Sequence, residues 1–411
     1  MFLEKKLNID IICQSFISLM INFMGLFACG DIFAEVSRNT LLEKYPMVFT
    51  FTCVMSFTGI VETLFTIYIT KYKETMYNDY YNIVKTNSAM LLMVSVVFGA
   101  TIGSSGLLIS FLYKTIEIFS SVKFILAITI SCFIGTFLFI LSLVITLEIA
   151  EIAEIDAKNI VIPLISAVSD VIHLLCMRNI VLIVDSVTEN VAFILYLFSA
   201  LVFGVIFLYY LSQTKYINQE SSDTIGNVSN IDMVQIDLHD SCDDEVQGQQ
   251  LNSVAFITMN ISSFLCCIIC SFLCGVIVEK VSVKMPLVPQ IFPFFSGMSL
   301  SIALIYWHKN YNTVMSKGEK QIVVNTLLSI TLVISLIYLL ILYMYEYSVN
   351  SIFSLIFIGF FSALTLGLMF LLEKFNGFEV RNMELFTLPT ITIISDIVSI
   401  FMLLIIGYVN K

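Results

Sequence analysis

Charged side chains are scarce in this sequence. Only 12% of its 411 residues are Asp, Glu, Lys or Arg, whereas 58% are hydrophobic and the mean hydropathy is +0.95. Because soluble domains carry about 25% charged residues, this composition excludes that class and indicates an integral membrane protein. Long uncharged runs recur in place of short alternating segments, which favours membrane-spanning helices over a β-barrel.

Basic residues are too few for a nucleic-acid surface. Twenty Lys and Arg stand against 31 Asp and Glu, a formal net charge of −11, and no basic patch with interleaved aromatic residues occurs. The ten cysteines fall mainly within apolar runs and the three histidines are scattered, which indicates neither a disulfide framework nor a zinc spacing. No P-loop or nucleophile motif occurs, so we expect no enzyme chemistry and no organic cofactor.

Runs of about 20 apolar residues predict eleven membrane-spanning helices. They cover approximately residues 9–30, 46–70, 88–112, 122–147, 159–182, 190–212, 252–278, 287–307, 322–345, 350–372 and 385–409. One long polar loop, residues 213–250, separates the sixth run from the seventh, and its acidic and amide side chains predict a disordered linker. Its segment "DLHDSCDDE" offers carboxylates for a weak cation site, although a solvated acidic tract is the simpler interpretation.

The distribution of basic residues predicts an orientation. Alternate sides of the eleven runs collect twelve and eight Lys and Arg, with the excess on the N-terminal side. This bias favours a cytosolic N-terminus and a cytosolic 213–250 loop, in the plasma membrane or an internal membrane. Glycosylation of the Asn227-Val-Ser sequon would invert the assignment. The first run lacks a following cleavage site and is expected to be a retained span.

Two of the apolar runs contain copies of one segment. "VIPLISAVSDVIHLL" (161–175) aligns without gaps with "TLPTITIISDIVSIF" (387–401), each position being 226 residues from its counterpart. The identical pairs that matter are Pro163 with Pro389, Ser169 with Ser395, and Asp170 with Asp396. Proline precedes aspartate by seven residues, about two helical turns, so both lie on nearly the same helix face.

Weaker echoes extend the duplication along the chain. "CGDIFAE" (29–35) corresponds to "CGVIVEK" (274–280), and proline-bearing segments lead into Gly59 and Gly297. We therefore predict two five-span repeats, residues 1–182 and 251–411, joined by one span and the acidic loop in residues 183–250. Six spans precede the second repeat, so the repeats are parallel and related by an axis along the membrane normal. One chain then suffices for function.

The duplication suggests a purpose for Asp170 and Asp396. If the fifth span of each repeat lines the axis, the two carboxylates face each other about half-way through the bilayer. Each costs at least about 2.5 kcal/mol at the centre of a spanning helix. A divalent cation passing between them offsets that cost, and oxygen ligands at a partly hydrated site suit Mg²⁺.

These segments resemble the MgtE-like magnesium transporters, specifically the eukaryotic solute carrier family 41, whose members fuse two such domains. The family's fifth-span signature runs approximately D-P-D-N-x-x-x-P-x-x-x-x-x-G-D-[LV]. "DAKNIVIPLISAVSDV" matches it at Asp156, Asn159, Pro163 and Asp170, and "NMELFTLPTITIISDI" at Pro389 and Asp396, with Asn382 and Glu384 near the polar cluster. The resemblance implies that Asp170 and Asp396 line a pore.

The sequence also departs from the family pattern. Ser169 and Ser395 replace the glycine before each aspartate, and the second-span G-N-x-x has become "GIVE" and "GMSL". The glutamate of the family's "GNLE" is kept as Glu62, which we interpret either as a pore ligand or as a partner within the bundle. The prolines are expected to free carbonyls near the site, and the glycines to shape it.

Simpler interpretations accompany these hypotheses. Each aspartate can instead be a polar residue bonded to a neighbouring helix, and His173 can either tune the site or only pack. Glu148, Glu151, Glu154 and Asp156 either attract cations to a pore mouth or form a solvated helix end. The alternatives to Mg²⁺ transport are carriage of another divalent metal, sodium-coupled export and, from a different class, a membrane-embedded metal-dependent lipid enzyme.

Overall fold

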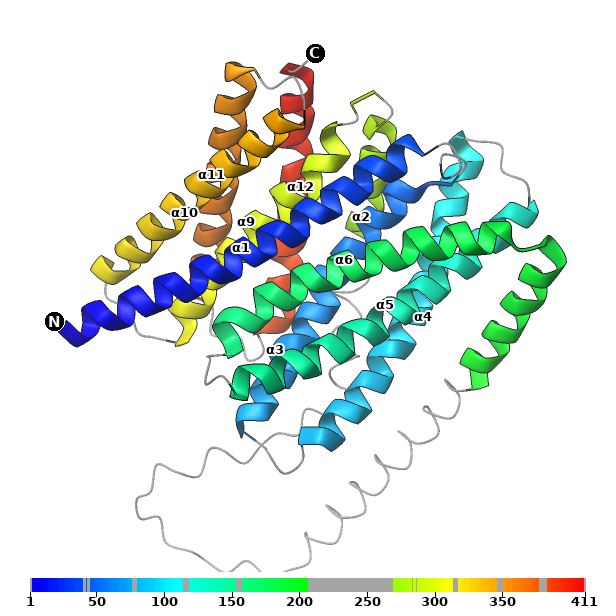
Figure 1. Ribbon diagram of the computed structural model, residues 1–411, viewed down its shortest axis with the longest axis horizontal. Coiled ribbons are helices and arrows are strands. Elements are labelled where there is room, and N and C mark those ends of the chain that lie inside the picture. The colour runs from blue at the N-terminus through cyan, green and yellow to red at the C-terminus, as the bar shows by residue number, and fades with distance from the viewer. Residues whose placement is uncertain are drawn as a thin grey trace, which may run out of the picture.

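A computed structural model describes residues 2–39, 42, 45–75, 80–113, 118–152, 157–205, 269–282, 284–285, 287–312, 317–345, 350–376 and 383–409. All regular structure in these ranges is helical (Figure 1). The labelled elements are α1 (Phe2–Arg38), α2 (Met47–Phe57), the π-helix η1 (Thr58–Glu62), α3 (Thr63–Thr75), α4 (Tyr80–Tyr113), α5 (Ile118–Ile152), α6 (Ala157–Ser186), α9 (Leu287–Asn312), α10 (Lys317–Met344), α11 (Ser351–Asn376) and α12 (Met383–Val409).

Nine helical stretches within the described ranges are long and apolar enough to cross a membrane. They are Phe16–Arg38, Met47–Thr70, Ile83–Phe111, Ser121–Ile152, Leu164–Ser186, Leu287–Trp307, Gly318–Met344, Ser351–Lys374 and Thr387–Tyr408. The chain is thus an all-helical, multi-pass membrane protein, as its composition predicts. Each stretch lies over one of the eleven predicted runs.

The two remaining predicted runs, 190–212 and 252–278, fall only partly within the described residues. Glu189–Val205 is a shorter apolar helix, and residues 269–282 are also helical. The predicted linker 213–250, with Asn227 and the acidic tract, lies outside the described ranges. The predicted orientation therefore stays a prediction.

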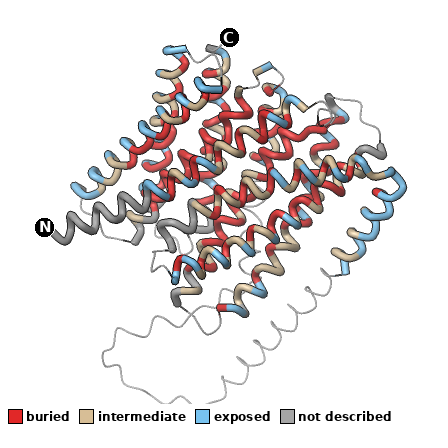
Figure 2. The backbone as a smooth tube through the Cα atoms, in the orientation of Figure 1, coloured by how far each residue is buried: buried red, intermediate tan, exposed pale blue. Residues whose placement is uncertain are grey.

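Burial identifies the central helices of the bundle. In the most apolar 18-residue part of each stretch, 83% of the residues are buried for Met47–Thr70 and 89% for Leu287–Trp307, against 39% to 56% for the other seven stretches. The outer helices instead leave large apolar side chains exposed, such as Leu336 and Leu355, where lipid would cover them (Figure 2). The α2–η1–α3 segment and α9 therefore form the centre around which the other spans pack.

Contacts at two glycines join the first half (residues 1–182) to the second (251–411). A Cβ added to Gly30 of α1 would lie 2.3 Å from the backbone oxygen of Gln290 at the start of α9. A Cβ added to Gly275 would lie 2.7 Å from Phe49 Cδ2 and 3.0 Å from its backbone oxygen in α2. Small residues allow such close helix approach in membranes. The first helix of each half thus packs against the second helix of the other.

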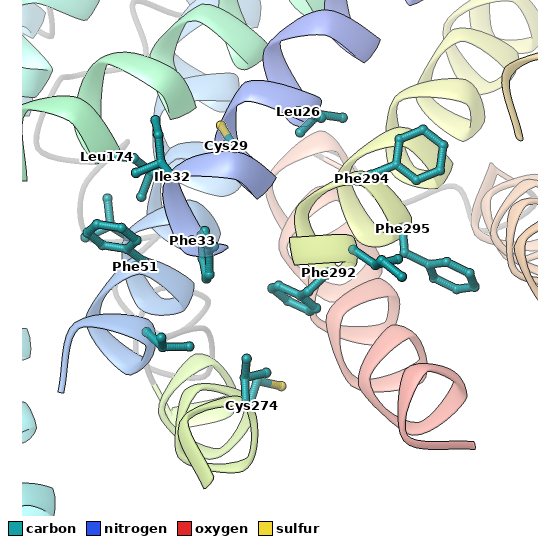
Figure 3. Packing of buried hydrophobic residues seen from close by; sticks show 14 of the residues in the cluster. Leu26, Cys29, Ile32, Phe33, Phe51, Leu174, Cys274, Phe292, Phe294 and Phe295 are labelled. Atoms are coloured by element: carbon teal, nitrogen blue, oxygen red, sulfur yellow. The ribbon is translucent and has the colours of Figure 1, made fainter. Parts of the chain in front are cut away.

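Apolar side chains fill the space between these helices. Phe33 of α1 lies against Phe51 of α2, and Leu26 of α1 lies toward α9 (Figure 3). Phe33 and Phe51 make an edge contact with centroids 5.3 Å apart. This continuous packing holds α6, α1 and α9 in fixed positions around the central segment.

Candidate functional site

The α2–η1–α3 span changes helix type at its middle. Residues Thr58–Glu62 form one π-helical turn between two α-helical stretches. The backbone N–H of Thr63 reaches the carbonyl of Thr58, five residues earlier, and the Thr63 hydroxyl approaches the same oxygen at 3.4 Å. Single π-turns occur frequently at functional sites because they re-aim side chains. Here the turn presents Thr58 and Glu62 to neighbouring helices.

Both predicted aspartates contact this segment. Asp170 of α6 and Asp396 of α12 are buried, with 5% and 8% of their surfaces exposed. Thr58 donates a hydrogen bond to Asp170. Ser56, two residues earlier, donates one to Asp396 at 2.8 Å. One short stretch of the first half therefore holds a carboxylate from each half.

The two aspartates also have matching partners within their own halves. Thr58, which bonds Asp170, immediately precedes Gly59. Ser296, which immediately precedes Gly297, donates to Asp396 at 2.5 Å. The hydroxyl before each glycine thus serves the aspartate of the same half. These contacts follow the sequence alignment of the two halves residue by residue.

The two carboxylates come from helices that both pack against η1, and the prediction that they face each other stays a prediction. η1 packs against both α6 and α12, whereas α6 and α12 share no extended contact within the described ranges. Asp170 is near enough to both Asp396 and Glu62 for electrostatic interaction. No basic side chain of the described part of the chain pairs with either aspartate. Hydroxyl groups are their hydrogen-bond partners.

Glu62 belongs to a separate polar cluster beside Asp170. Its carboxylate accepts hydrogen bonds from Ser169, the residue before Asp170, and from Thr136 of α5 at 3.1 Å. His173 Nε2 lies 3.3 Å from Glu62 Oε1. Glu62 and His173 are each only 1% exposed. The cluster therefore joins η1, α5 and α6 away from water.

The contacts of His173 fix one of its ring protons. His173 Nδ1 lies 3.0 Å from the backbone oxygen of Ser169, which only accepts, so Nδ1 carries a proton. Nε2 lies 3.3 Å from both Glu62 Oε1 and the Thr136 hydroxyl. The His173 ring packs closely against Gly135, where an added Cβ would lie 2.5 Å from Cδ2. His173 is thus both hydrogen-bonded within the cluster and tightly packed, and its role in tuning the site stays a prediction.

This cluster has no counterpart in the second half. Leu300 stands at the position of Glu62 and Ser399 at that of His173, both buried. Within the described ranges, the Ser399 hydroxyl has no hydrogen-bond partner. The two halves thus share the aspartate contacts but differ in the carboxylate beside them.

The four predicted glycines and prolines have different surroundings. A Cβ at Gly297 would lie 2.7 Å from Leu26 Cδ2, so this glycine admits close packing of α1. A Cβ at Gly59 would meet Thr392 at an ordinary 3.7 Å, so space alone does not require glycine there. Pro389 is buried within helical α12. The Pro163 backbone is helical, and its side chain lies outside the described part.

Four other predicted residues remain untested. Asn159 and Glu384 lie in helical backbone, but their side chains are outside the described part. Asp156 and Asn382 fall between the described ranges. Their predicted roles in an ion pathway stay predictions.

The hydroxyl donors are the functional side chains that sequence reasoning did not single out. Ser56, Thr58 and Ser296 hold the aspartates, and Thr136 holds Glu62. A signal for two of them exists, since Thr58 and Ser296 occupy the same position before the glycines of the aligned segments. Ser56 and Thr136 carry no such mark.

The acidic end of α5 is partly neutralised by a lysine. Lys73 Nζ lies 3.1 Å from Glu148 and 2.8 Å from Glu151, and it donates to the Leu147 carbonyl at 3.1 Å. Partial burial disfavours its charge, but the two carboxylates outweigh this and raise the pKa of Lys73. Burial also raises the pKa of the adjacent Tyr80 phenol to about 12. Glu148 and Glu151 therefore form a latch with α3.

The described residues contain no group of three His, Cys, Asp or Glu side chains able to hold a metal ion together. The two aspartates and their hydroxyl partners thus supply too few oxygen ligands to replace all the waters around a metal ion. Comparisons with known protein families, curated proteins and solved structures return no match.

Proposed function

We propose that this chain carries a divalent cation, first of all Mg²⁺, across a membrane past Asp170 and Asp396. The observation that carries the proposal is the attachment of both buried aspartates to residues 56–58 of the central span. A carboxylate in a membrane interior is costly unless a proton or a cation neutralises it. Two such groups beside one segment indicate a place where a doubly charged ion is stabilised during passage.

The chemistry of the surrounding groups favours a hard cation. Asp170 and Asp396 supply carboxylate oxygens, and Ser56, Thr58 and Ser296 supply hydroxyl oxygens. No soft ligand contributes to these contacts. Mg²⁺ keeps several waters and is commonly held by one or two carboxylates, so it fits a site with this few charged groups. The ion would pass partly hydrated.

The resemblance to the MgtE-like transporters supports a common evolutionary origin with them. Chains of the MgtE-like type place an aspartate after a proline in the fifth span of each repeat. The matching donors Thr58 and Ser296, and the reciprocal packing at Gly30 and Gly275, support two parallel repeats. We propose a divergent member of that group, functional as a single chain, with a cytosolic N-terminus.

Ion uptake by the purified full chain in liposomes tests this function. Vesicles loaded with a Mg²⁺ indicator should fill faster than protein-free vesicles when Mg²⁺ is added outside. Replacing external K⁺ with Na⁺ at constant ionic strength separates simple carriage from sodium coupling, and a series with Mn²⁺, Ca²⁺ and Zn²⁺ tests other metals. The proposal would be refuted if none of these divalent ions entered the vesicles faster with the protein than without it.

A further inference from the structure

Glu62 is a buried carboxylate beside a single basic group of the described part of the chain. That group is the His173 imidazole, whose Nε2 lies 3.3 Å from Glu62 Oε1, and each of the two side chains is only 1% exposed. No lysine or arginine within the described ranges pairs with Glu62. An ionised carboxylate is costly in such surroundings, and uptake of a proton removes that cost.

The contacts between Glu62, His173 and Thr136 accommodate one further proton. The Thr136 hydroxyl lies 3.1 Å from Glu62 Oε1 and 3.3 Å from His173 Nε2, and those two atoms are 3.3 Å apart. Thr136 has one hydroxyl hydrogen to donate, and His173 Nδ1 uses its own on the Ser169 carbonyl. Without another proton, Oε1 and Nε2 would face each other as two acceptors. A proton on Oε1 that is donated to Nε2 satisfies both atoms.

Burial favours the arrangement in which this proton resides on Glu62. A neutral carboxyl group beside a neutral imidazole brings no charge into the cluster. Transfer of the proton to His173 would create two buried charges, each with a desolvation cost of several kcal/mol. Ser169 donates to the other carboxyl oxygen, Oε2, which remains an acceptor when Oε1 is protonated. The observed hydrogen bonds are therefore compatible with a protonated Glu62.

The other titratable groups around the pair are acidic. Asp170 of α6 interacts electrostatically with Glu62 and with Asp396 of α12. Cys132 of α5 is within electrostatic range of Glu62, and Cys29 of α1 is within range of Asp170. Ionisation of any of these groups favours retention of the proton on Glu62, because negative charges repel.

The basic side chains of the neighbouring helices make ion pairs with other residues. Lys73 of α3 lies eleven residues after Glu62, about 16 Å by helical rise, and pairs with the acidic end of α5. Arg178 of α6 lies five residues after His173 and pairs with Glu35 of α1. The charge of Glu62 is thus balanced by a proton or by a cation in the pathway.

We propose that Glu62, hydrogen-bonded to His173, binds a proton in competition with the divalent cation at Asp170. Ser169 connects the two sites, since it precedes Asp170 and donates to Glu62. A cation at Asp170 favours the ionised form of Glu62, and by linkage the proton weakens the cation equally. The competition rests on the proposed transport function, whereas proton binding is separable from it. Leu300 and Ser399 occupy the equivalent positions of the second half, so one chain has one such site.

Infrared spectroscopy of the full chain in lipid nanodiscs, without divalent ions, tests the proton site. A protonated carboxyl group has a C=O stretching band that shifts in D₂O. At neutral pH we expect one such band to be lost in Glu62→Gln. The same band should change position in His173→Gln, which keeps Glu62 but alters the group that its proton meets, and this variant also serves if Glu62→Gln does not fold. Glu189→Gln, at an exposed carboxylate, should leave the band unchanged.

Mg²⁺ uptake into liposomes at two pH values tests the competition. The parent should take up Mg²⁺ about fivefold or more slowly at mildly acidic than at mildly alkaline pH. Glu62→Gln has a permanently neutral side chain and should stay near the slower rate at both. A parent spectrum in which neither substitution alters a carboxyl band would overturn the proton site. Equal pH dependence in parent and Glu62→Gln would overturn the competition. The band without any uptake would refute transport alone.

Discussion

Ser56 and Asp396 lie 340 residues apart in the chain, yet the serine hydroxyl donates a 2.8 Å hydrogen bond to the aspartate. This contact brings the last described helix onto the middle of the first half. Two residues later Thr58 holds Asp170 in the same way. The central claim, that both aspartates act at one site, depends on this pair of hydroxyls.

Removing the Thr58 hydroxyl should destabilise the folded protein, because Asp170 then loses a hydrogen bond. In Thr58→Val the buried carboxylate loses its donor, and we expect the free energy of unfolding to fall by about 1.5 to 3 kcal/mol. Thr52→Val, on the same helix, is the matched control, because the Thr52 hydroxyl bonds only the Val48 carbonyl of its own helix. Chemical unfolding of both variants in detergent makes the comparison, and equal losses would deny Thr58 its role.

The Glu62–His173 contact should be sensitive to a methyl group at Gly135. In Gly135→Ala the new Cβ would meet the His173 ring at 2.5 Å and displace it from Glu62, at a cost of about 1 to 3 kcal/mol. Gly367→Ala is the control, since nothing lies within 4 Å of its added Cβ. Thermal unfolding in nanodiscs should separate the two variants by several degrees. A Gly135→Ala protein as stable as Gly367→Ala would show that His173 is loosely packed.

The two glycine contacts between the halves should both be intolerant of substitution, Gly30 more than Gly275. Gly30→Ala places a Cβ 2.3 Å from the Gln290 backbone oxygen, and Gly275→Ala places one 2.7 Å from Phe49. Because backbone cannot move as a flexible side chain can, we expect Gly30→Ala to lower stability by about 2 kcal/mol or more. Gly318→Ala has open space and should be neutral. Protease resistance in membranes measures all three, and a tolerant Gly30 would contradict the described packing.

The latch of Lys73 with Glu148 and Glu151 predicts a pH dependence of stability. The pKa of Lys73 is raised above its ordinary value of 10.5 in the folded protein. The latch should therefore contribute fully below pH 10.5 and be lost as pH rises through the higher folded pKa. We expect Lys73→Gln to cost about 0.5 to 1 kcal/mol at pH 8, and that cost to shrink above pH 11. A difference that stays constant across this range would exclude the ion pairs as its source.

The sequence predicts the large features because they depend on composition and local repetition. Nine of the predicted runs coincide with described spans, and the duplicated segment singles out Asp170 and Asp396 as an aligned pair. The π-turn at Thr58–Glu62 is not predictable in this way, since apolar periodicity barely distinguishes a single π-turn from α-helix. Its partners Thr136, Ser169 and Asp170 lie 74, 107 and 112 residues away in the chain.

The Glu62–His173 cluster is a second feature that could not be predicted from the sequence. The sequence left Glu62 open between a pore ligand and a partner within the bundle, and it left His173 open between tuning the site and packing. Only the fold brings Thr136 of α5 and Ser169 of α6 to the same carboxylate. Long-range partners of buried polar groups are set by tertiary packing, which a single sequence does not reveal.

The most direct test is Mg²⁺ uptake into liposomes by the parent, Asp170→Asn and Asp396→Asn. Thr365→Val serves as the control, because its buried hydroxyl bonds only the Phe361 carbonyl of its own helix. Each Asn variant keeps the size of the side chain but removes its charge, so uptake should fall about tenfold or more while the control matches the parent. Uptake by both Asn variants at the parent's rate, at equal protein content, would contradict the account.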